Sequence, residues 1–237
     1  MSPDVPRDDS PSPATTSGAP EGSALDRRAA DLVQRLLAVG IDGLGPFDGA
    51  AEVAAAARKQ NPSAESAIHA VLRQHTRLVA GNGFATGLGG LLTLPVALPA
   101  NVFGFHVLAV RAVAAMAELR GYDTSRPEVR SAILLTLVGA DATDVLKSAG
   151  LPTGGRLTGR LTGLLTSRVP GPVLMLVNKG VGFRIIARFG TQGLLRLPQR
   201  ALPVVGGVVG AGVDTVMFRR IAKAAEHALP PRSAQTP

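Results

Sequence analysis

The sequence predicts an all-α protein with a single multi-helix domain, and three observations support this fold class. Apolar residues recur at helical spacing along most of the chain. Ala, Leu and Val supply most of the 46% hydrophobic content, whereas aromatic residues make up only 3% and Trp is absent. The most apolar stretch, residues 78–110, contains no Asp, Glu, Lys or Arg and is rich in glycine. We therefore expect a helical domain built around a glycine-rich apolar hairpin.

Polar tails are expected on both sides of a domain that covers residues 24–228. Residues 1–23 are rich in Pro, Ser, Asp and Gly and have almost nothing to bury, which predicts a disordered tail. No apolar segment typical of a secretory signal peptide follows the start. Residues 229–237 predict a disordered C-terminus. The chain has no Cys, which excludes disulfides and Cys-ligated metals and fits a reducing cytoplasm.

Three helices are expected before the apolar stretch. The first begins near Ala24 and ends around Gly40, and the second is a short Ala-rich helix over residues 50–59. Asn61 before Pro62 is typical of an N-cap followed by proline at the first helical position, which would open a third helix. The residues on one side of this third helix are Ile68, Val71, Leu72, His75, Leu78 and Val79.

The apolar stretch is expected to form a packed helical hairpin that does not span a membrane. Its glycines permit close helix contact and its prolines divide it, so structural roles are assigned to Gly83, Gly87, Pro95 and Pro99. A helix over residues 83–94 would be about 18 Å long, against a hydrocarbon core of roughly 30 Å. The next helix carries Arg111 in its middle, where arginine is costly in lipid. Burial under other helices and lipid contact by the first arm both remain compatible with this pattern.

Helical segments continue after the hairpin. Ser125 or Thr124 would cap a helix with Pro127 in its first turn. Asp141 and Asp144 then open a short helix and would share a face three residues apart. That spacing suits a divalent cation or an acid/base pair, although stabilisation of the helix N-terminus explains it more simply.

The last helix begins near residue 203 and has a glycine spacing that favours close packing. Gly206 and Gly210 form a GxxxG pattern that lets another helix approach. Asp214 follows the apolar half of this helix, so we expect it to be partly buried. A buried carboxylate requires a basic partner, and the prediction is a structural ion pair with Arg184 or Lys179.

The positive charge is concentrated in the C-terminal half. The net charge is +8, and no acidic residue occurs between residues 145 and 213. Such a segment would suit anionic lipid headgroups, and solvated helix faces with acidic partners elsewhere in the fold are an equal alternative. The predicted lipid or anion contacts are Arg156, Arg160, Arg168, Lys179, Arg184 and Arg188.

Several segments together resemble the EcsC family of bacterial proteins. They are GNGFATGLGGLLTLPVALPANV at residues 81–102, GYD at 121–123 followed by RPEVR, NKGVGFR at 178–184 and PVVGGVVGAGVD at 203–214. The resemblance covers roughly residues 65–225. It implies an α-helical protein associated with the cytoplasmic side of membranes, in a family named after a gene that neighbours an ABC transporter. Many relatives carry an acidic residue near the position of Asn101, so a carboxylate role there is not expected in this chain.

No catalytic motif is present in the sequence. The glycine-rich runs are not P-loops, because GxxxxGK[ST] is absent, and neither GxSxG nor HExxH occurs. We expect no cofactor and no metal. The weak catalytic candidates are His106, Arg111, Asp141 and Asp144, the polar residues nearest the apolar core. A core role for His106 is the simpler interpretation.

The leading functional hypothesis is a peripheral membrane protein at the inner face of the plasma membrane. It would act as a non-catalytic accessory or scaffold for a membrane complex, such as an ABC transporter, and would contact an anionic surface. One alternative is a membrane-surface hydrolase, which requires the four candidates to converge on a pocket. Another is an integral protein with re-entrant half-helices. Nucleic acid is not an expected partner, because one Tyr and few Phe leave little for base stacking.

Overall fold

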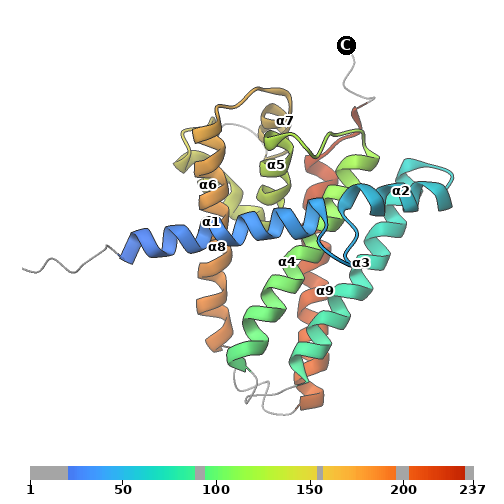
Figure 1. The fold of residues 1–237 in the computed structure, drawn as a ribbon, viewed down its shortest axis with the longest axis vertical. Helices are drawn as coiled ribbons and strands as arrows, with labels where there is room; N and C mark the ends of the chain where they lie inside the picture. Colours follow the sequence, from blue (N-terminus) through green and yellow to red (C-terminus); the bar gives the residue numbers. More distant parts are fainter. Residues whose placement is uncertain (1–20, 89–93, 154–156, 196–202, 233–237) are drawn as a thin grey trace, which may run out of the picture.

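The fold was analysed in a computed structural model that describes residues 21–88, 94–153, 157–195 and 203–232. These ranges are helical and contain no β-strand, which confirms the predicted all-α class (Figure 1). The α-helices are α1 (Glu21–Leu37), α2 (Ala50–Gln60), α3 (Ala64–Gly87), α4 (Leu94–Leu119), α5 (Pro127–Val138), α6 (Ala142–Ser148), α7 (Leu157–Thr166), α8 (Gly171–Leu195) and α9 (Pro203–Ala228). A π-helical turn, η1 (Ala38–Asp42), follows α1, and a 3₁₀ turn, η3 (Gly139–Asp141), precedes α6.

Three long helices, α3, α4 and α9, pack side by side and form the centre of the molecule (Figure 1). Helix α1 crosses α8, α5 and α6 pack against α8, and α7 packs against α5 and α9. The middle of α4, residues 109–117, is buried throughout, so this helix is the core of the domain. The C-terminal ends of α3 and α8 and the N-terminal ends of α4 and α9 all lie at the lower end of the view.

Glycines bring the backbones of α3 and α9 into direct contact. A Cβ atom added to Gly87 would lie 2.4 Å from the carbonyl oxygen of Gly206, and one added to Gly210 would lie 2.4 Å from that of Gly83. Real Cβ atoms do not approach so closely, so only glycine fits at these contacts. Gly206 and Gly210 therefore meet α3, and the two helices run antiparallel.

The glycines and prolines of the apolar stretch interrupt its helices less than the sequence predicts. Helix α3 continues through Gly81 and Gly83 to Gly87, because close packing against α9 outweighs the low helix propensity of glycine. Pro95 and Pro99 lie inside the first two turns of α4 and do not divide it. Pro95 is tolerated because the first four N–H groups of a helix have no partner within it, whereas Pro99 in the second turn leaves out one intrahelical hydrogen bond.

Two predicted helix caps are wrong. Asn61 is the C-cap of α2, where its side chain donates to the carbonyl of Ala57. The N-cap of α3 is Ser63, whose hydroxyl accepts from the backbone N–H of Ser66 in a reciprocal capping box. Neither Thr124 nor Ser125 caps α5.

The described residues include positions on both sides of the expected domain limits. Helix α1 begins at Glu21, inside the predicted N-terminal tail, and the remainder of that tail lies outside the described residues. Leu229 falls within the C-terminal tail that the sequence predicts, but its side chain is completely buried. Tyr122 also donates to the carbonyl of Pro230 at 2.6 Å, which attaches the end of α9 to the α4–α5 loop.

Candidate functional site: an apolar end with a basic collar

The end of the molecule where α3, α4 and α9 meet carries no charge on its described helices. We call it the apolar end and define it as residues 78–88 of α3, 94–105 of α4 and 203–213 of α9. Several of its large apolar side chains are exposed to solvent. They are Leu78, Phe84, Leu88, Val205 and Val208, with exposed fractions between 39% and 61%. A cluster of exposed apolar side chains marks a surface that contacts lipid or another protein.

Polar groups inside the apolar end hydrogen-bond to each other. The amide nitrogen of Asn82 donates to the backbone and side-chain oxygens of Asn101, at 3.1 and 2.8 Å. The hydroxyl of Thr86 also donates to the Asn101 side chain, at 2.8 Å. Gly104 leaves room for this network, because a Cβ there would lie 2.6 Å from the Asn82 side-chain oxygen. The network joins α3 to α4, so Asn101 has a structural role.

Five exposed cations border the apolar end, and we call them the basic collar. They are Arg73 and Arg77 on α3 with Arg219, Arg220 and Lys223 on α9. Because the two helices are antiparallel, the cations that precede the apolar residues of α3 lie beside those that follow the apolar residues of α9. Arg219 and Lys223 line a cavity of about 290 Å³ together with Leu72 and Thr76.

The basic collar has few acidic neighbours along its own helices, and the nearest exception is Glu226, which follows Lys223 by three residues and lines the same cavity. Residues 66–88 of α3 contain no Asp or Glu, and neither do residues 215–225 of α9. Among the described residues, none of the five cations forms an ion pair. Their charge is therefore available to an anionic surface. Sequence patterns do not indicate this set, because its two halves are about 140 residues apart and meet only through α3–α9 packing.

The basic stripe of α8, by contrast, is neutralised within the fold. Lys179 lies 2.6 Å from Asp26, and Arg188 lies 2.6 Å from Asp141. Arg184 lies 3.7 Å from Asp144 and donates to the carbonyl of Asp141. The predicted pairing of Asp214 with Arg184 or Lys179 is therefore wrong. Asp214 is buried, with one carboxylate oxygen against Gly83.

The other predicted lipid contacts lie near α7. Arg156 is outside the described residues, and the side chain of Arg160 is not described. Arg168 is exposed and lines a cavity of about 430 Å³ with Leu164, Val169 and Val173. Of these three arginines, only the side chain of Arg168 is described, and it forms no ion pair among the described residues.

His106 and Arg111, two of the weak catalytic candidates, both lie on α4 but contact different parts of the protein. His106 is buried, and Nδ1 lies 2.9 Å from the carbonyl oxygen of Val102. Burial lowers its pKa to about 4, and the nearby positive charge of Arg188 also lowers it. Arg111 lies beneath the ring of Phe47, 5.7 Å from its centroid, and burial lowers its pKa.

The four weak catalytic candidates do not assemble into one reactive site. Asp141 and Asp144 are held by the arginines of α8, whereas Arg111 contacts the segment after α1. None of the four lines the cavities described here. Within the described residues, no group of three His, Asp or Glu side chains is placed to hold a metal ion.

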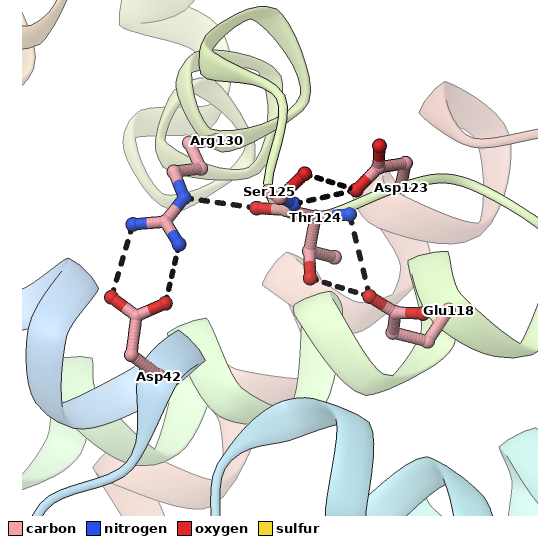
Figure 2. A network of polar contacts seen from close by, with 6 residues as sticks. All are labelled: Asp42, Glu118, Asp123, Thr124, Ser125 and Arg130. Atoms are coloured by element: carbon pink, nitrogen blue, oxygen red, sulfur yellow. Dashed lines mark hydrogen bonds and ion pairs between the residues drawn. The ribbon is translucent and has the colours of Figure 1, made fainter.

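A polar network fixes the loop between α4 and α5, which contains the GYD segment (Figure 2). Arg130 binds both carboxylate oxygens of Asp42, and its Nε donates to the carbonyl of Thr124 at 2.9 Å. The N–H and hydroxyl of Thr124 both donate to Glu118. Ser125 donates to Asp123, and these hydrogen bonds lower the pKa of the Asp123 carboxyl. Glu118, Asp123 and Arg130 each bond to backbone of the loop, and Asp42 holds Arg130 in place, so the network is structural.

Comparison with known proteins identifies the family. A family model described as the EcsC protein family matches residues 62–232. The chain belongs to the EcsC family. The matched region includes α3 to α9, and therefore the apolar end, the basic collar and the network of Figure 2. In this EcsC protein, α1 and α2 lie outside the match. No curated protein and no solved structure matches the chain.

One helical segment of this EcsC protein has the length and composition of a membrane span. It is Ala100–Leu119 of α4, and 72% of its most apolar window is buried by the rest of the protein. A buried core helix passes the same test, and Arg111 lies in its middle. This segment alone gives only weak evidence for a span.

Proposed function

We propose that this EcsC protein binds the cytoplasmic face of the plasma membrane as a peripheral, non-catalytic accessory of a membrane complex. The observation that supports the proposal is that the basic collar adjoins the apolar end along both α3 and α9. Apolar side chains that enter the interface and cations at headgroup depth are the two elements of monotopic binding. The transporter-associated gene that gives the family its name suggests an ABC transporter as the complex.

The dimensions favour shallow insertion. Residues 78–88 of α3 and 203–213 of α9 each form a helical length of about 16 Å, which is less than the roughly 30 Å of a hydrocarbon core. These ends therefore reach into one leaflet only. Each of the five exposed apolar side chains would contribute about 1 kcal/mol if half of it left water. Each cation near the surface adds about 1 kcal/mol on anionic lipid.

Vesicle flotation tests this proposal. The full chain is expected to float with vesicles that contain anionic lipid at low salt and to be released at high salt. Val208→Asp should reduce binding at least tenfold, because it places a charge at the apolar end. Leu176→Asp is the matched control, since Leu176 is 51% exposed, compared with 61% for Val208, but lies near the start of α8.

Two results would contradict peripheral binding. The proposal would be contradicted if the wild-type protein did not float with anionic vesicles at low salt. Equal losses of vesicle binding in Val208→Asp and Leu176→Asp would also contradict it. In fractionated cells, an alkaline carbonate wash is expected to release the protein. Retention after that wash would support the integral alternative with re-entrant half-helices.

A further inference from the structure

A cavity lies between the C-terminal end of α5, Arg188 of α8 and one face of α9. Its volume is about 700 Å³, which is within the range of small-molecule sites. Its walls are mainly apolar side chains. They are Leu137, Val138, Val213, Val216, Met217 and Ile221. Two arginines, Arg188 and Arg220, are the only charged residues among those that line it.

The two arginines have different roles in this cavity. The Nη2 of Arg188 donates to the carbonyl of Val138 at 3.0 Å and to Asp141 at 2.6 Å, so this guanidinium holds the end of α5 and is neutralised. Arg220 is exposed and forms no ion pair within the described residues. The cavity therefore combines apolar walls with one net positive charge, which complements an anion attached to an apolar chain.

The cavity is continuous with the apolar end of α9. Gly212 and Val213 belong to both, and Val216, one turn further, is 52% exposed at the cavity. Gly212 faces open space, because a Cβ built on it would have no neighbour within 4 Å. An amphiphile could thus extend its chain along α9 and place its head beside Arg220.

We infer that this cavity binds a single-chain anionic amphiphile, with its carboxylate or phosphate at Arg220 and its chain along the apolar wall of α9. The site shares Gly212, Val213 and Arg220 with the membrane-docking surface, but its other walls include α5 and α8. None of the five exposed apolar side chains of the apolar end lines the cavity. Binding of a soluble amphiphile and flotation with vesicles are therefore separate measurements, and either can fail without the other.

Calorimetric titration of the full chain tests the site with dodecanoate and dodecyl phosphate below their micelle concentrations. Dodecanol tests the need for charge, and acetate and inorganic phosphate test the need for a chain. At least one anionic amphiphile should bind with a stoichiometry of one, about tenfold more tightly than dodecanol. Preference for dodecanoate indicates a fatty acid as the natural ligand, and preference for dodecyl phosphate indicates a phospholipid-type head. If acetate or inorganic phosphate bound as tightly as the matching amphiphile, the inference that the ligand carries an apolar chain would be wrong.

Paired variants locate the site on the protein. Arg220→Gln should weaken binding about tenfold, whereas Arg219→Gln, one residue away and also exposed, should not. Gly212→Leu should weaken binding at least tenfold by filling the cavity. Gly81→Leu is its control, because Gly81 also faces open space on a helix but does not line the cavity.

Circular dichroism of each variant confirms that folding is retained. Equal effects of Arg219→Gln and Arg220→Gln, unchanged binding by Gly212→Leu, or equal affinity for dodecanoate, dodecyl phosphate and dodecanol would each overturn the inference.

Discussion

The basic stripe of α8 and the basic collar of α3 and α9 contain the same residue types but differ in their electrostatic surroundings. On α8, Lys179, Arg184 and Arg188 each lie beside an aspartate that comes from another segment. The five collar cations have no such partners among the described residues. A long acid-free segment therefore does not identify a charged surface. The positions of acidic residues in the folded protein decide which cations remain available.

The largest expected effect comes from separating the helices that build the collar. Gly87→Leu places a Cβ 2.4 Å from the Gly206 carbonyl oxygen, where backbone must move. We expect the free energy of unfolding to fall by about 3 kcal/mol or more, measured by urea denaturation. Gly81→Leu should leave stability unchanged or raise it by less than about 1 kcal/mol. Equal stability of the two variants would contradict the close α3–α9 contact.

The next effect comes from His106, which is buried and is affected by the charge of Arg188 on α8. The pKa of His106 falls from 6.5 to about 4 on folding, chiefly through burial. Below pH 6.5 the unfolded chain binds a proton that the folded chain does not, so stability falls as the pH decreases from 6.5 towards 4. The loss approaches about 3 kcal/mol at pH 4.

Urea unfolding between pH 7.5 and pH 4 measures this dependence. The variant His106→Gln removes the titrating ring and should show a flatter profile over the same range. A profile in this variant as steep as that of the wild type would assign the pH dependence to other groups, among them His75, whose pKa is also lowered by burial.

A direct test of the comparison removes two cations from each region. The double variant Arg219→Gln/Lys223→Gln should lose about 2 kcal/mol of binding to anionic vesicles, or roughly thirtyfold in affinity at low salt. The variant Lys179→Gln/Arg184→Gln removes cations that already have acidic partners and should change affinity by less than about threefold. Equal losses in flotation assays would show that the α8 pairs open at the membrane.

The smallest effect is expected from the ion pairs themselves. Asp141→Asn removes the acidic partner of Arg188. The side chain of Arg188 is 32% exposed, and that of Asp141 is 37% exposed. Solvent screening keeps such a pair below about 1 kcal/mol, and urea unfolding should show a loss within that limit. A loss of several kcal/mol would instead identify Arg188 as an essential support of the α5 end.

Much of the helical architecture was predictable, because it depends on local periodicity. The apolar spacing located the long helices, and the GxxxG of Gly206 and Gly210 indicated a close helix contact. Caps were less predictable. Asn61 and Ser63 both suit a helix start, and the structure selects Ser63 through the reciprocal bonds with Ser66.

By itself, the sequence determined the all-α class, the charge-free stretch and membership of the EcsC family, since composition, periodicity and ordered motifs are local properties of the chain. Tertiary structure alone decided that Gly83 meets Gly210, that the cations of α8 are neutralised, and that those of α3 and α9 form one collar. Charge pairing and surface continuity depend on distances between residues far apart in sequence. Those distances are fixed only when the helices pack.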